Sequence, residues 1–129
     1  MDPELRKVFS YVKSVPDFAL INVDSVESRN GYGDTPLHIV CVGGHSEWAK
    51  VLLANSADIN AVGEFGFTPL HYAIEHEQLD VIKLLLKYDP SLIRDYDGNT
   101  QLDLALLSGS SVIIELIEQK FNKNRLTDH

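Results

Sequence analysis

The chain has 129 residues, of which 44% are hydrophobic and 23% charged, and these values exclude a disordered, collagen-like or membrane-embedded protein in favour of one folded domain. Its 19 acidic residues outnumber the 11 lysines and arginines, so the formal net charge is −8. This balance disfavours nucleic acid as a ligand and favours a basic partner, although an acidic surface also serves solubility.

The first segment, residues 1–28, is predicted to be an N-terminal capping half-repeat that begins with a helix. Asp2-Pro3 is a suitable helix start, because an acidic side chain can cap the first turn and proline fits the first helical position. The apolar residues that follow share one helical face: Leu5, Val8, Phe9 and Val12. The segment lacks the basic start and apolar stretch of a secretory signal. A cytoplasmic protein with no membrane contact is therefore expected.

The remainder of the chain repeats itself with a period of about 33 residues. Thr35-Pro36-Leu37-His38 recurs as Thr68-Pro69-Leu70-His71 and, weakened, as Thr100-Gln101-Leu102-Asp103. The threonine can cap a helix, and apolar residues at helical spacing predict two helices in each unit. Such a pair cannot bury its apolar stripes alone, so the units must stack. The predicted units are 29–61, 62–93 and 94–119, and a polar tail, 120–129, follows them.

Two departures from the repeat predict local differences. Glu77 occupies the place where Gly44 and Gly109 turn between the two helices, so it is expected to have a positive φ at a cost of about 1 kcal/mol. The third unit replaces proline and histidine with Gln101 and Asp103 and is expected to be the C-terminal cap. Its last helix should bury four residues, Val112, Ile113, Leu116 and Ile117.

These motifs resemble the ankyrin repeat, whose units begin with a turn and Thr-Pro-Leu-His and continue with two helices. The resemblance implies an all-α solenoid of stacked helix-turn-helix units with β-turn or hairpin fingers. About three repeats and the N-terminal capping helix would form one domain, 1–129. It also implies that His38 and His71 hydrogen-bond backbone between neighbouring loops, and that Cys41 takes the place of a small buried alanine.

No arrangement of residues in the sequence predicts catalysis or metal binding. Five histidines and one cysteine are present, but the motifs of phosphate-binding loops, serine hydrolases and zinc proteases are absent. The single cysteine cannot form an internal disulfide. Trp48 is interpreted as a packing residue. No catalytic residue, metal ligand or cofactor is therefore predicted.

The resemblance places partner binding on a concave side formed by finger tips and the exposed side of each first helix. The predicted partner-binding residues are Tyr32, Asp34, Glu64, Phe65, Phe67, Glu75, His76, Tyr96, Asp97 and Asn99; Val42, Gly43 and Leu107 occupy further variable positions. Four aromatic rings stand at finger positions that the core does not require: Tyr32, Phe65, Phe67 and Tyr96. They are either interface anchors or rings that stack along the fingers. Acidic neighbours, with Asp95 among them, indicate either a basic partner or a solvated surface.

The sequence therefore predicts a monomeric, non-catalytic module that binds another protein, with no role in nucleic-acid or membrane binding. With caps expected at both ends, a sharper hypothesis is a stand-alone inhibitor, such as an immunity-type protein for a basic toxin. Two alternatives stay open at this point: an adaptor that joins two proteins, and an enzyme of unrecognised type.

Overall fold

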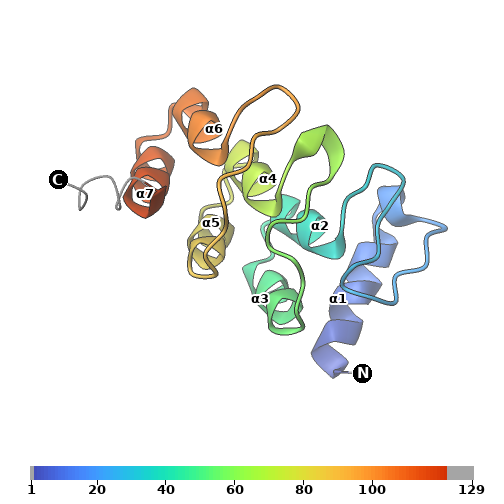
Figure 1. The fold of residues 1–129 in the computed structure, drawn as a ribbon. Coiled ribbons are helices and arrows are strands. Elements are labelled where there is room, and N and C mark those ends of the chain that lie inside the picture. The colour runs from blue at the N-terminus through green and yellow to red at the C-terminus, as the bar shows by residue number, and fades with distance from the viewer. Residues whose placement is uncertain (1, 122–129) are drawn as a thin grey trace.

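The computed structural model describes residues 2–121, which form seven α-helices, two short 3-10 helices and no strand in that range (Figure 1). The α-helices are α1 (Pro3–Ser14), α2 (Pro36–Val42), α3 (Ser46–Ala54), α4 (Pro69–Glu75), α5 (Leu79–Leu86), α6 (Gln101–Ser108) and α7 (Ser111–Phe121). The 3-10 helices are η1 (Pro16–Phe18) and η2 (Glu64–Gly66).

Each predicted helix start is confirmed. Asp2 caps α1, and Thr35, Thr68 and Thr100 cap α2, α4 and α6 by accepting a backbone N–H from the third helical residue. Pro36 and its equivalent in α4 occupy the first helical position, where a missing N–H leaves no hydrogen bond unmade. The repeated motif thus fixes where each first helix begins.

The helices stack in two rows (Figure 1). The first helices α2, α4 and α6 pack in succession, as do the second helices α3, α5 and α7, and α1 lies at one end against α2 and α3. One continuous core runs between the rows, and its fully buried side chains include Leu37, Leu52, Leu70, Ile82, Leu85 and Ile117. The expected all-α stack is confirmed. The units stack because none of them can bury its apolar face by itself.

The loops before the first helices form short fingers closed by backbone hydrogen bonds. The N–H groups of Asn30, Gly63 and Asp95 each donate to the carbonyl four residues later, at 3.0, 2.8 and 2.8 Å. In the outer two fingers the Oδ1 of Asn30 or Asp95 also accepts two backbone N–H groups within its loop. Neighbouring fingers meet where the Tyr96 N–H donates to the Phe65 carbonyl at 3.0 Å.

The turn between the two helices of each unit has the predicted left-handed backbone. Gly44, Glu77 and Gly109 have φ values of 76°, 52° and 72°, so the expectation for Glu77 is confirmed. Ser56 and Asp89, which follow the second helices of the first two units, are left-handed as well, at 70° and 53°. Neither residue is a glycine, so the sequence carried no signal for these two turns.

The C-terminal unit differs from the expected cap. Val112 was expected to be buried but is 51% exposed, while Ile113 and Ile117 are buried. Helix α7 also runs to Phe121, two residues past the expected end of the third unit, and the rest of the expected tail, 122–129, lies outside the described residues. Val112 stands in the first turn of α7, at the repeat position that the exposed Glu47 and Asp80 occupy in α3 and α5.

Candidate partner-binding face

The fingers are held in register by two buried histidines. In each, Nδ1 accepts the N–H of the capping threonine, and Nε2 reaches the next finger, from His38 to the Phe67 carbonyl at 2.9 Å and from His71 to the Asn99 carbonyl at 3.1 Å. A nitrogen that accepts on one side leaves the other protonated, so Nε2 donates. Burial lowers the pKa of both imidazoles. The predicted structural role of the histidines is confirmed.

Asp34 is a structural residue and not the exposed acid that was expected. Its side chain is buried, with the residue only 3% exposed. The Glu64 N–H donates to its Oδ1 at 2.9 Å, and the Tyr72 hydroxyl donates to both carboxylate oxygens, at 3.1 and 3.2 Å. A Cβ at Gly63 would overlap the same carboxylate. Asp34 therefore binds the neighbouring finger through the Glu64 N–H, in the space that Gly63 leaves open. Asp95 is buried as well.

Phe67 is a packing residue, which corrects the expectation of a ring that the core does not require. It is 8% exposed, stacks on His71 with ring centroids 5.1 Å apart, and contacts the edge of Tyr72 at 5.2 Å. These contacts anchor the finger to the start of α4. Phe67 therefore packs against α4 and is not an exposed ring on the finger.

Phe65 and Tyr96 are exposed, at 58% and 79%, and lie on adjacent fingers. The hydrogen bond from the Tyr96 N–H to the Phe65 carbonyl joins their backbones, and the Tyr96 side chain lies so close to Gly66 that a Cβ there would clash. Phe65 also has a left-handed φ of 62°, which is rare for a bulky residue and costs conformational energy. Tyr32, at the tip of the first finger, is exposed too.

A hollow of about 270 Å³ opens beside these fingers, and we call it the acidic hollow. Its lining residues are Tyr11, Val15, Asp17, Asp34, Ile39, Val42, Gly43, Glu64, Tyr72 and His76. They come from α1, η1, α2, η2 and α4 and from residues beside these helices, which places the hollow over the first two units. Partial burial raises the pKa of the Glu64 carboxyl, and the charges of Asp34 and Asp17 raise it further.

The other predicted site residues do not share one site. His76 lines the acidic hollow, whereas the neighbouring Glu75 lines a second hollow of about 260 Å³ between α4 and α6, together with Leu104 and Leu107. Asp97 is exposed, and Asn99 is half-buried with its carbonyl bonded to His71. The structure thus brings Asp34, Glu64 and His76 into one hollow and leaves Glu75, Asp97 and Asn99 outside it.

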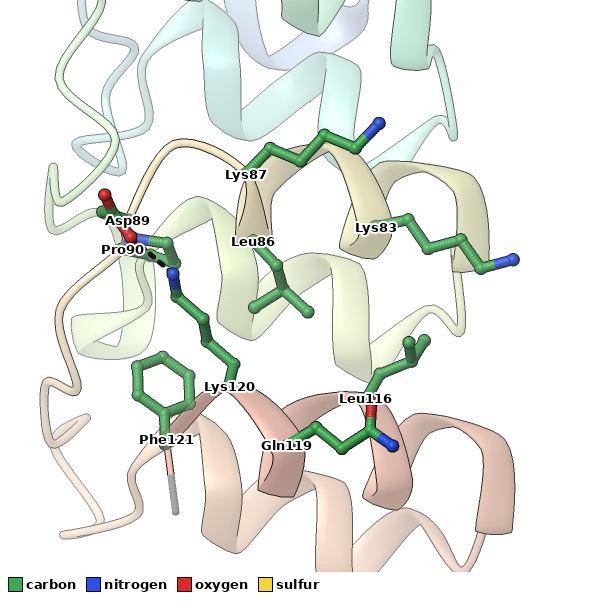
Figure 2. A pocket seen from close by; sticks show the side chains of 9 residues that line it. All are labelled: Lys83, Leu86, Lys87, Asp89, Pro90, Leu116, Gln119, Lys120 and Phe121. Carbon is green, nitrogen blue, oxygen red and sulfur yellow. Dashed lines mark hydrogen bonds and ion pairs between the residues drawn. The ribbon is translucent and has the colours of Figure 1, made fainter. Parts of the chain in front are cut away.

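A larger groove of about 770 Å³ lies between α5 and α7, on the other row of helices (Figure 2). Leu86, Leu116 and Phe121 supply its apolar lining, and the Lys120 ammonium pairs with Asp89. Figure 2 shows Lys83 and Lys87 pointing outward from α5. Lys83 and Lys87 belong to α5 and its C-terminal cap, and the packing of α7 against α5 adds Lys120 to the same groove.

The thiol of the single cysteine is not accessible for chemistry. Cys41 is fully buried, and this burial raises the pKa of its thiol, which keeps it protonated and unreactive. Among residues 2–121, no group of three or more histidine, cysteine or acidic side chains is arranged to hold a metal ion. No helix in that range has the length and apolarity needed to span a bilayer.

The model of a known family, ankyrin repeats in three copies, matches residues 13–94 and 57–127 of the chain. The chain belongs to the ankyrin repeat family. It is 47% identical over 83 residues to an ankyrin repeat protein of Rickettsia bellii. The aligned region covers 60% of this chain and 35% of that protein. Over 95 residues it is 36% identical to the mouse protein fem-1 homolog A-like, covering 74% of this chain and 14% of the relative.

A third relative, an ankyrin repeat protein of Acanthamoeba polyphaga mimivirus, is 30% identical over 120 residues, covering 91% of this chain and 15% of its own length. The chain therefore spans about a third or less of these relatives. Ankyrin repeats are generally protein-protein interaction modules and are typically non-enzymatic, which agrees with the binding role and the absence of enzymatic activity predicted from the sequence.

Among the residues of the acidic hollow that were not predicted from the sequence are Tyr11, Val15, Asp17 and Tyr72. Tyr11, Val15 and Asp17 line the acidic hollow but precede the first repeat, so no repeated position pointed to them. Tyr72 could have been found, because it takes the same repeat position as Ile39, which lines the same hollow, and Leu104, which lines the hollow beside α6. All four become neighbours only when α1 packs against α2.

Proposed function

We propose that this ankyrin repeat protein is a non-catalytic binding module that takes a basic protein on its finger face. By finger face we mean the acidic hollow together with the exposed tips Phe65 and Tyr96. The observation that carries the proposal is the hollow itself, where Asp17, Asp34 and Glu64 line one depression beside aromatic walls. The proposed module is cytoplasmic and takes neither nucleic acid nor membrane as its ligand.

Charge supports a cationic ligand side chain in this hollow. Within residues 2–121 the ion pairs join Lys7 to Glu4, Arg94 to Asp103 and Lys120 to Asp89, and none neutralises the three acids of the hollow. Asp34 is already bonded to Tyr72 and Glu64, so its charge acts at a distance. Asp17 and Glu64 are left to contact an incoming guanidinium or ammonium group, which would also pack on Tyr11 and Tyr72.

The two finger tips support an anchored interface. Exposed aromatic rings are the commonest residues whose loss weakens protein complexes, and the strained backbone at Phe65 holds its ring outward at a conformational cost. Because Glu64 precedes Phe65 directly, the same finger contributes both a hollow acid and an anchor. A partner that inserts a basic side chain into the hollow would therefore also make apolar contact with the Phe65 ring beside it.

A sharper form of the proposal is an inhibitor, in which the acidic face covers the basic active surface of another protein, as an immunity-type protein does with a basic toxin. The adaptor role is the second candidate. The groove between α5 and α7 favours it, since this groove lies on the other row of helices and is bordered by lysines (Figure 2). An adaptor would bind two partners together, whereas an inhibitor would suppress the activity of one.

The test is a nuclear magnetic resonance titration with a short arginine-containing peptide. Wild type should show shifts for Tyr11, Tyr72 and His76, and the double variant Asp17→Asn, Glu64→Gln should lose them because it removes both accessible charges. Glu47→Gln, an exposed acid in the first turn of α3, is the matched control and should bind as wild type does. Shifts confined to the α5–α7 groove, or an undiminished response in the double variant, would contradict the proposal.

Partner capture tests the finger tips. With a protein retained by the wild-type chain, Phe65→Ala and Tyr96→Ala should each weaken binding by about 2 kcal/mol while the melting temperature stays nearly constant. Raised salt should slow association, because exposed charges steer encounter. Variants that lose stability along with binding would instead identify the rings as structural.

A further inference from the structure

The groove between α5 and α7 lies beside a helical turn that the earlier units lack. In the repeat register Phe121 corresponds to Asp89 of the second unit. Helix α5 ends at Leu86 and the chain then turns through the left-handed Asp89, whereas α7 continues to Phe121. The additional turn of α7 places Lys120 and Phe121 in the wall of the groove (Figure 2).

Contacts across the groove hold this additional turn in place. The Lys120 ammonium pairs with the Asp89 carboxylate, which belongs to the loop after α5, and this contact lowers the pKa of that carboxyl. Leu86 and Leu116 extend into the space between the two helices (Figure 2), and both are only half-buried. The groove therefore has an apolar lining that stays partly open to solvent.

Two lysines that border the groove have no acidic partner. None of the ion pairs among residues 2–121 includes Lys83 or Lys87, and both residues are exposed. They stand at positions i and i+4, in α5 and at its C-terminal cap, so they lie on one side of that helix with Cβ atoms about 5–6 Å apart. Their ammonium groups are free to pair with an incoming anion.

The lining of the groove is cationic although the protein is acidic. It contains three lysines and a single acid, Asp89, which is already paired with Lys120, whereas the whole chain has a formal charge of −8. A ligand that carries both apolar and acidic side chains is therefore complementary to it. An anionic membrane is less suited, because its surface would repel the exposed Asp80 and Glu115 on the same two helices.

The residues after Phe121 do not match this groove in charge. Residues 122–129 contain Lys123 and Arg125 but only one acid, Asp128, so the cationic lining would repel them. A further repeat unit would not cover the groove either. Helix α5 packs on both α3 and α7, so a new second helix would join the row on the far side of α7. The groove is thus available to another protein.

We propose that the groove between α5 and α7 binds an acidic amphipathic helix of a partner protein. A helix laid between two packed helices buries its apolar stripe, here against Leu86, Leu116 and Phe121. Carboxylates at i and i+4 on its flank would pair with Lys83 and Lys87, which have the same spacing. The inference goes beyond the proposed function, because this groove lies on the other row of helices and takes a ligand of opposite charge.

Fluorescence anisotropy of a labelled peptide tests the binding. The probe is an amphipathic helical peptide of about four turns, with leucines on one face and glutamates at i and i+4 beside them. The full chain should bind it, and raised salt should weaken the complex by screening the ion pairs. A peptide with glutamine in place of each glutamate should bind about fivefold more weakly or worse. A peptide with serine in place of each leucine should lose binding.

Substitutions in the chain locate the bound peptide. The double variant Lys83→Gln, Lys87→Gln should weaken binding about fivefold or more, because it removes both unpaired charges. The matched control Lys13→Gln, Lys50→Gln makes the same change in net charge at exposed lysines of α1 and α3 and should bind as wild type does. Phe121→Ser should weaken binding through lost apolar contact. Unchanged melting temperatures ensure that lost binding is not lost folding.

The groove and the acidic hollow should act independently. Asp17→Asn, Glu64→Gln removes the accessible charges of the hollow and should not weaken binding of the glutamate peptide. In nuclear magnetic resonance spectra this peptide should shift Leu86 and Leu116 and leave Tyr72 unchanged. Failure of one proposal is therefore distinguishable from failure of the other.

Several outcomes would overturn the proposal. The glutamate peptide could fail to bind the full chain, or bind the double variant at Lys83 and Lys87 as tightly as wild type. Nuclear Overhauser contacts between residues 122–129 and Leu86 in the free chain would identify the chain's own segment as the occupant. Groove signals that shift with the concentration of the free chain would identify a second copy. Phosphatidylserine vesicles that bind wild type but not the double variant would identify a membrane surface instead.

Discussion

At the scale of single residues, Glu77 shows how the fold determines a backbone conformation that its side chain does not favour. It is left-handed at φ 52°, in the turn where the neighbouring units have Gly44 and Gly109. A side chain with a Cβ is disfavoured there. Glu77→Gly should therefore stabilise the protein by up to about 1 kcal/mol in urea unfolding, the gain being limited by the greater freedom of glycine in the unfolded chain.

Gly109→Ala is the converse change and serves as the matched control. A Cβ at Gly109 would meet no atom within 4 Å, so only the backbone conformation opposes it, and a loss of about 1 kcal/mol is expected. At Gly44 an added Cβ would also collide with the Gln78 side chain. A loss of stability there would therefore not report on the backbone conformation alone. A destabilised Glu77→Gly variant would mean that the Glu77 side chain makes a stabilising interaction.

At the scale of elements, the histidine links between fingers should make stability depend on pH. Burial lowers the pKa of His38 and His71 in the folded state, while an unfolded histidine titrates near 6.5. Above that pH both states are neutral and the links contribute fully. As the pH falls below about 6.5, only the unfolded state gains protons, and each histidine removes about 1.4 kcal/mol per pH unit until its folded pKa is reached.

Urea unfolding at pH 7.5 and 5.5 measures this dependence. His71→Gln keeps a donor for the Asn99 carbonyl but cannot titrate, so it should lose less stability between the two pH values than wild type does. His76→Gln removes an exposed imidazole and controls for the general effect of losing a histidine. The explanation fails if His71→Gln has the same pH dependence as wild type.

At the scale of the whole molecule, the shared core should make the units unfold together. Leu85 is fully buried in α5, and Leu85→Ala should cost about 2–5 kcal/mol through lost contacts and the cavity left behind. The sole tryptophan, Trp48 in α3, packs against Tyr11 and His45 and so reports on the first unit. Its fluorescence and the circular dichroism of all helices should therefore change in one coincident transition.

The control for that experiment is Leu92→Ala, at a leucine that is exposed between α5 and α6, which should change stability by less than about 0.5 kcal/mol. If the variant at Leu85 instead loses helix before the Trp48 signal changes, the units fold independently and the single-core description is incorrect.

The fold followed from the sequence because its signals are local and repeated. The capping threonines, the prolines of the first two units and the apolar stripes fix each helix pair, and a pair that cannot bury its own stripe must stack on the next. The left-handed turn at Glu77 was predictable for the same reason, since its equivalents are glycines. Even the buried roles of His38, His71 and Cys41 follow from their places in the repeat.

Tertiary structure decided which predicted site residues are exposed. Phe65 and Phe67 lie two residues apart on one finger, yet only Phe65 points to solvent, because Phe67 stacks on His71. Asp34 became internal because Gly63 leaves space for its carboxylate. The acidic hollow also needs Asp17 from outside the repeats. Exposure and proximity depend on which neighbour fills a given space, and residues distant in the chain supply that neighbour.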